Sequence, residues 1–172
     1  MTDNHYTQQQ KDLNGLKGWL ILVGFGLIFK PVYLIVSLVP IYQEIFSSTQ
    51  WEIITTEGAQ TYGHTLVPFI IGESLINIFL FVAAFYLLYL FFTKHYLFPK
   101  IFIFIAGFTF IFVLIDAWVG AIILKTPFID NETGRELFRS GIYAIIWIPY
   151  MYVSKRVKAT FVKGKTNEEL ST

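Results

Sequence analysis

Two long apolar runs, joined by a short polar connection, fill the middle of the chain and limit the folds that it can adopt. They cover residues 67–92 and 101–124, and Lys94 and Lys100 lie in the connection between them. The hydrocarbon core of a bilayer is about 30 Å thick, so a helix needs about 20 apolar residues to cross it. Each run therefore predicts a membrane-spanning helix, and together they predict a transmembrane hairpin.

The composition agrees with a chain that has lipid as its solvent. Of the 172 residues, 55% are hydrophobic, 19% are aromatic and only 15% are charged, whereas about 25% are charged in soluble domains. The net charge of +1 gives no indication of a nucleic-acid partner. The absence of Cys excludes a thiolate metal site and a thiol nucleophile, and we predict neither a metal nor a cofactor.

Two further apolar runs bring the number of predicted spans to four. Residues 18–39 form the first span, and residues 137–153 form the last, whose 17 residues are close to the lower limit for crossing a bilayer. The predicted fold class is therefore all-α, an integral membrane four-helix bundle over residues 18–153. It lies between an N-terminal tail of residues 1–17 and a basic C-terminal tail of residues 154–172.

The first polar connection, residues 40–64, leaves two alternatives open. Thr49 and Glu52 are spaced as in a capping box, and Trp51 between them is of a type that anchors at membrane interfaces. A short amphipathic helix lying on the membrane surface explains this pattern, and an irregular loop is the alternative. A second pattern of the same kind, from Thr133 to Glu136, predicts the start of the last helix.

The distribution of Lys and Arg predicts the orientation in the membrane. The two tails and the connection between the second and third spans carry nine of these residues, and the opposite side carries three. Positive charge accumulates on the cytoplasmic side, so both termini are expected in the cytoplasm. The C-terminal tail is also expected to bind anionic lipid at that face through five basic residues: Lys155, Arg156, Lys158, Lys163 and Lys165.

Polar residues within the spans form the candidate site: Lys30, Glu73, Asn77, Asp116 and Arg139. At a rise of about 1.5 Å per residue, the four charged ones fall at the centre or in the outer half of the membrane. A lone charge near the centre costs about 2.5–3.5 kcal/mol, so Lys30 is expected to pair with Glu73 or Asp116. Loss of one partner is then expected to destabilise the bundle. The residues are interpreted either as a closed ion-pair network that fixes helix register or as an ion relay, proton relay or polar pocket.

Helical spacing predicts which faces of the spans turn inward. Glu73 and Asn77 are one turn apart, and the face that they share is expected to point into the bundle. The same reasoning selects one face of the last span, formed by Arg139, Tyr143, Ile146 and Tyr150.

Motifs near both ends of the chain resemble those of a bacterial inner-membrane family. They are GLKGWLILV at residues 15–23, IWIPY at residues 146–150 and SKRVKATFV at residues 154–162. The family is the one catalogued as domain of unknown function 2569, and the resemblance extends from about residue 15 to residue 162. It implies a four-helix integral protein of the bacterial inner, or cytoplasmic, membrane. It implies no reaction, substrate or catalytic residue.

The sequence contains no Ser/His/Asp, HExxH or Cys/His arrangement, so no catalytic residue is predicted and we do not expect an enzyme. The first hypothesis is a non-enzymatic accessory or interaction protein that binds a membrane-protein partner or a second copy of itself. The alternative is a small transporter or an ion- or proton-conducting protein that uses the intramembrane charges. A water-filled cavity that reaches Glu73 or Asp116 would favour the alternative, and a dry bundle with an exposed groove would favour the first.

Overall fold

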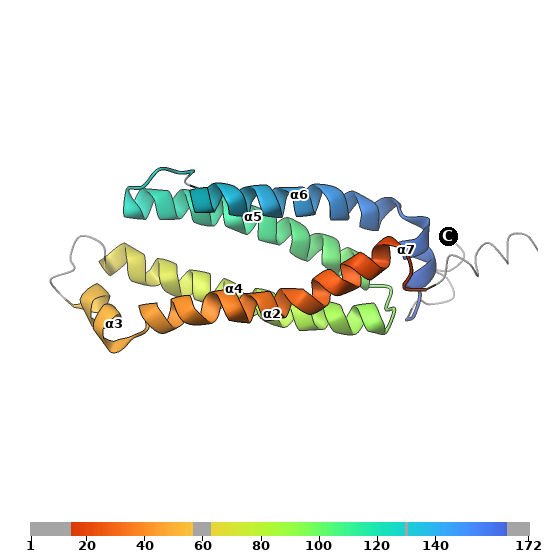
Figure 1. Ribbon diagram of the computed structural model, residues 1–172, viewed down its shortest axis with the longest axis horizontal. Coiled ribbons are helices and arrows are strands. Elements are labelled where there is room, and N and C mark those ends of the chain that lie inside the picture. Colours follow the sequence, from red (N-terminus) through yellow and green to blue (C-terminus); the bar gives the residue numbers. More distant parts are fainter. Residues whose placement is uncertain (1–14, 57–62, 130, 165–172) are drawn as a thin grey trace, which may run out of the picture.

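The computed structural model describes residues 15–56, 63–129 and 131–164, and this part of the chain is helical. The prediction of an all-α fold is confirmed. Four long helices lie along one axis, with a short helix at each end of the array (Figure 1). In chain order the helices are α2 (Trp19–Ile45), α3 (Ser48–Thr55), α4 (Gly63–Phe92), α5 (Phe98–Leu124), α6 (Asn131–Val153) and α7 (Lys155–Thr160).

Three of the long helices have the length and apolar character needed to cross a membrane. They are α2, α5 and the segment His64–Phe92 of α4. These helices contain the predicted spans at residues 67–92 and 101–124 and nearly all of the one at 18–39. The protein is therefore a membrane protein with at least three helices of spanning type. Helix α6 contains the fourth predicted span, but it is not among these three, since Arg135, Glu136 and Arg139 lower the hydropathy of its first half.

Two helix starts differ from the sequence prediction. A helix does form in the first polar connection, as one alternative held, but α3 begins at Ser48, before Thr49. The Ser47 hydroxyl donates a hydrogen bond to the carbonyl oxygen of Glu44 at 2.8 Å and makes no side-chain cap on α3. Trp51 packs on Phe46, with ring centroids 5.0 Å apart, so it helps to hold α3 against the end of α2. Helix α6 begins at Asn131, before the predicted start at Thr133.

The buried core lies at the end of the array that carries α7. Phe98 is fully buried. It belongs to a cluster of side chains that have at most a few per cent of their surface exposed: Leu20, Leu27, Leu87, Leu90, Phe91, Phe102, Met151, Val157 and Phe161. Toward the opposite end the α5–α6 pair diverges from the α2–α4 pair (Figure 1). The outer surface carries many exposed large apolar side chains, as a lipid-facing surface requires.

Close packing of α2 on α4 depends on Gly24. A Cβ atom at this position would lie 2.9 Å from a ring carbon of Phe91, whereas a Cβ atom at Gly26 would meet open space. We expect Gly24→Ala to lower the free energy of unfolding by about 1–3 kcal/mol because the Phe91 ring must shift. Gly26→Ala is the matched control, since both changes gain the same helix propensity. Thermal unfolding in detergent compares them, and equal midpoints for the two variants would contradict the proposed contact.

Candidate functional site

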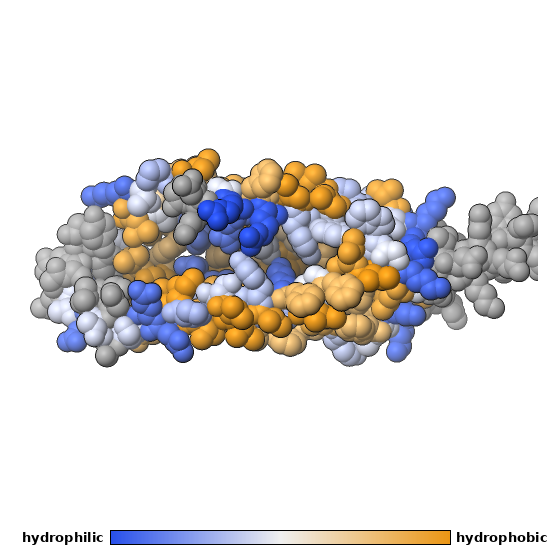
Figure 2. Space-filling model, viewed as in Figure 1, coloured by the Kyte–Doolittle hydropathy of each residue, from blue (hydrophilic) through white to orange (hydrophobic). Residues whose placement is uncertain are grey.

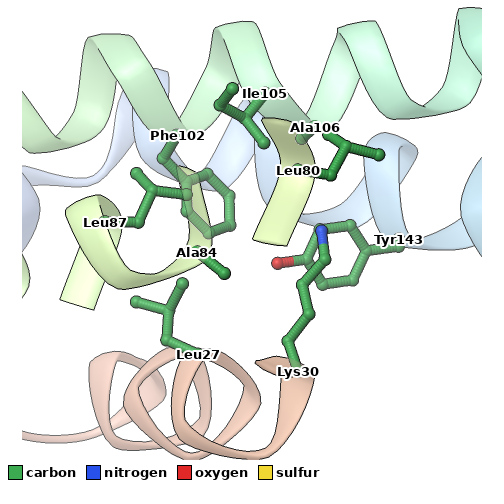
Figure 3. A pocket seen from close by; sticks show the side chains of 9 residues that line it. All are labelled: Leu27, Lys30, Leu80, Ala84, Leu87, Phe102, Ile105, Ala106 and Tyr143. Atoms are coloured by element: carbon green, nitrogen blue, oxygen red, sulfur yellow. The ribbon is translucent and has the colours of Figure 1, made fainter. Parts of the chain in front are cut away.

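Lys30 lies between the long helices, in a pocket to which all four contribute. Figure 3 shows its amino group extending from α2 toward the ring and hydroxyl of Tyr143 on α6. The remaining walls are apolar and include Leu27 from α2, Leu80, Ala84 and Leu87 from α4, and Phe102, Ile105 and Ala106 from α5. The pocket therefore offers one amine and one phenol to anything that enters it.

The predicted ion pair between Lys30 and an intramembrane acid is not formed. Within the described part of the chain, no carboxylate lies within ion-pairing distance of Lys30. The axial positions explain this, because Leu80 lines the Lys30 pocket seven residues after Glu73, a separation of about 10 Å along α4. Ala106 lines the same pocket ten residues before Asp116, a separation of about 15 Å along α5.

Glu73 and Asp116 instead lie within the range of electrostatic interaction with each other, and so does Glu136. Asp116 and Glu136 both act on Glu73 by electrostatic repulsion, and Glu136 acts in the same way on Asp116. Both Glu73 and Asp116 are partly exposed. Sequence reasoning missed Glu136 because it was assigned to a helix cap, although it stands one turn before Arg139 on the same helix. A group of three acids does not form the balanced network that one interpretation of the sequence required.

Two tyrosines of α2 bind the other polar residues of the candidate site. Asn77 donates a hydrogen bond to the Tyr42 hydroxyl at 3.1 Å. Arg139 donates one to the Tyr33 hydroxyl at 3.1 Å, and its guanidinium carbon lies 5.8 Å from the centre of the Tyr33 ring. Sequence reasoning passed over both tyrosines, although Tyr33 stands one turn after Lys30.

The predicted inward face of α6 is only partly correct. Tyr143 faces the Lys30 pocket as expected, but Ile146 is 49% exposed and Arg139 is also exposed. Ala144 and Met151, which are 8% and 2% exposed, mark the face that α6 turns to the core. The helix is therefore rotated relative to the prediction, because apolar packing rather than the polar residues sets its orientation.

Helices α2 and α6 meet through long side chains. In the described chain, the backbones of three helix pairs lie close together at many positions: α5 and α6, α2 and α4, and α4 and α5. The backbones of α2 and α6 do not. Trp19 and Trp147 touch near the α7 end, with ring centroids 6.3 Å apart, and Tyr33 and Arg139 touch farther along. We call the strip between these two contacts the α2–α6 seam. Figure 2 shows hydrophilic side chains gathered between α2 and α6, on a face that is otherwise largely hydrophobic.

Comparison with known proteins gives one match. The family model described as "Protein of unknown function (DUF2569)" matches residues 13–162. The chain belongs to the DUF2569 family. The resemblance found in the sequence is thereby confirmed, and it extends over most of the length. No curated protein and no solved structure matches the chain. The comparison therefore identifies the family but indicates no activity.

In this DUF2569 protein the segments that carried the resemblance contact one another at the α7 end. The Gly15 amide donates to the Thr160 hydroxyl at 3.1 Å, and that hydroxyl donates to the Gly15 carbonyl oxygen at 3.3 Å. Phe161 stacks on Phe98, with ring centroids 4.5 Å apart. We call the unit formed by residues 15–18, 93–97 and 154–164 the α7 cap. Residues assigned from the sequence to two tails are thus part of the folded protein.

The basic residues predicted to bind lipid are spread over the α7 cap of this DUF2569 protein. Lys155 and Lys158 are exposed on α7, Arg156 is partly buried, and Lys163 follows α7. Lys165 lies outside the described residues. The described residues hold no group of three or more His, Cys, Asp or Glu side chains that could bind a metal ion.

Proposed function

We propose that this protein is a non-enzymatic interaction protein of the bacterial inner membrane, with four spans and both termini in the cytoplasm. In this proposal α6 is the fourth span, since it packs extensively against the spanning-type helix α5. The α2–α6 seam is the surface that receives a membrane partner. The nine-to-three asymmetry of Lys and Arg supports the orientation.

The position of Lys30 carries the proposal. A charge at this depth costs about 2.5–3.5 kcal/mol unless it is compensated. In the described chain the acids lie elsewhere, and Lys30 stands between the two side-chain contacts that close the seam. A polar group from outside the chain would provide the compensation, so the uncompensated amine favours an interaction role over a purely structural one.

The topology is tested with single cysteines at positions 8 and 58. In intact cells, a membrane-impermeant thiol reagent should label position 58 and should label position 8 only after the membrane is permeabilised. The chain has no cysteine of its own, so each signal comes from the introduced residue alone. Labelling of both positions from the same side would show that α2 does not cross the membrane and would contradict the proposed topology.

The interaction role is tested with a photo-crosslinking residue at Val36, one turn beyond Tyr33 on α2. We expect crosslinks to one membrane protein in cells, and we expect Lys30→Met to abolish them. The matched position is Val82, which is 60% exposed on α4 and points away from Leu80 and Ala84. A differently tagged second copy of the chain shows whether the partner is the protein itself. Crosslinks from Val36 that persist unchanged in Lys30→Met would contradict this role for the seam.

The alternative, a small transporter or ion-conducting protein, draws support from the three acids. Glu73 and Asp116 are partly exposed and Glu136 is exposed, which suits a water-filled entrance from the outer side. In that case Glu73→Cys would react with an impermeant maleimide from outside, whereas Leu87→Cys in the buried core would not. Absence of labelling at position 73 in a folded variant would count against this alternative.

A further inference from the structure

The fold brings Lys163 next to the connection between α4 and α5, which carries Lys94 and leads to Lys100 at the start of α5. The Lys163 amide donates to the Lys94 carbonyl oxygen at 3.2 Å, and the Tyr96 amide donates to the Lys163 carbonyl oxygen at 3.1 Å. The amine of Lys100 lies 6.0 Å from the centre of the Tyr96 ring. The backbones of Lys94 and Lys163 are therefore hydrogen-bonded side by side, and the Lys100 amine lies beside Tyr96. We call Lys94, Lys100 and Lys163 the three-lysine cluster.

The backbone around the three-lysine cluster is fixed. Residues His95 and Lys163 form a parallel bridge, and the rings of His95 and Tyr96 stack with centroids 4.9 Å apart. Gly164 has a φ of +90°, and a Cβ atom there would lie 2.9 Å from the His95 imidazole. Only glycine suits both the conformation and the space. The lysine stems thus start from a rigid base, which reduces the ordering cost of binding.

The cluster adjoins the lipid-facing surface. Tyr89 and Phe92, at the end of α4, are 62% and 58% exposed, and Lys94 lies two residues after Phe92. Figure 2 shows hydrophilic side chains in a band at this end, next to the hydrophobic surface of the helices. Within the described residues the three lysines form no ion pair. Basic residues that follow the end of a spanning helix in this way are expected at the level of the lipid phosphates.

We infer that the three-lysine cluster is a binding site for the phosphate group of an anionic phospholipid. Three cations on a rigid base complement one anionic headgroup, and the exposed aromatic residues beside them suit the acyl chains. A flexible basic tail would attract the same lipids in proportion to its charge alone. The folded cluster differs because its position, and not only the number of charges, determines the affinity. This inference does not depend on the role of the seam.

The test compares two variants that lose the same charge. The site variant is Lys94→Asn/Lys100→Gln/Lys163→Gln, with Asn at position 94 because its φ of 54° is left-handed. The matched variant is Lys17→Gln/Lys155→Gln/Lys158→Gln, which changes exposed lysines of the same cap. Native mass spectrometry of the purified full chain in detergent measures the binding of phosphatidylglycerol and of phosphatidylcholine. Unchanged unfolding midpoints verify that both variants fold.

We expect the site variant to bind phosphatidylglycerol at least about tenfold more weakly than the unmodified chain, and the matched variant to change by less than about threefold. Equal losses in both variants, no loss in either, or equal binding of the two lipids by the unmodified chain would overturn the inference. Excess inorganic phosphate should leave the lipid bound. Complete displacement of the lipid by inorganic phosphate would show that the site binds free phosphate and would overturn the assignment to lipid.

A variant that keeps every charge gives an independent test. Gly164→Val should displace the segment after α7, because its side chain would strike His95. We expect phosphatidylglycerol binding to weaken several-fold although the net charge is unchanged. Binding equal to that of the unmodified chain would contradict a site that depends on this geometry.

Discussion

Lys30→Met is expected to raise the free energy of unfolding of the purified protein by about 2–3 kcal/mol. The amine occupies a pocket with largely apolar walls, and its neighbour Tyr143 is a phenol that carries no compensating charge. Methionine has a similar length and removes the buried charge. Sequence reasoning predicted the opposite sign, because it placed Lys30 in an ion pair that the structure does not contain.

Thermal unfolding in detergent measures this effect. Lys155→Met, at an exposed position on α7, is the control and should change stability by less than about 0.5 kcal/mol. A lower midpoint for Lys30→Met would mean that the amine is compensated within the chain. A higher midpoint together with a lost crosslink from Val36 would fit a residue that is kept for function at the expense of stability.

Phe161→Ala is expected to lower the free energy of unfolding by about 3–5 kcal/mol, the largest loss that we predict. The ring is 2% exposed and packs on Phe98 and Phe91, with centroids at 4.5 Å and 5.8 Å. Its removal leaves a cavity where α7 meets the ends of α4 and α5. The contacts of Thr160 with Gly15 should be lost with it, since they depend on the position of α7.

Hydrogen exchange and thermal unfolding together measure the consequence. Amides of the α7 cap should lose protection in Phe161→Ala, while those in the middle of α4 and α5 keep it. The control is Tyr152→Ala, because that side chain is 74% exposed. Unchanged protection at residues 154–164 would show that the cap does not depend on this aromatic contact.

The helices could be predicted from the sequence because length and hydropathy are local properties. The runs at residues 67–92 and 101–124 lie within α4 and α5. The α7 cap could not be predicted in this way, since residues 154–164 have the composition of a basic tail. Their order comes from burial of Val157 and Phe161 against residues far away in the sequence.

The sequence predicted which polar residues lie within the helices, but it did not predict which of them contact one another. Counting residues along each helix placed Lys30 near the middle of the membrane, but it could not give the axial shift of one helix against another. That shift sets Lys30 level with Leu80 and Ala84 instead of Glu73. The rotation of α6 about its axis could not be predicted from the sequence either, because it depends on the burial of Ala144 and Met151 in the core.

A double-mutant cycle of Lys30→Met and Glu73→Gln tests the central claim most directly, through unfolding free energies measured in detergent. Residues that do not interact have additive effects within about 0.3–0.5 kcal/mol, and paired residues show coupling of about 0.5–3 kcal/mol. The separation along α4 predicts additive effects. Coupling of more than about 1 kcal/mol in favour of the pair would show that Glu73 compensates the charge of Lys30 within the chain. It would contradict the proposal that a group from a partner provides this compensation.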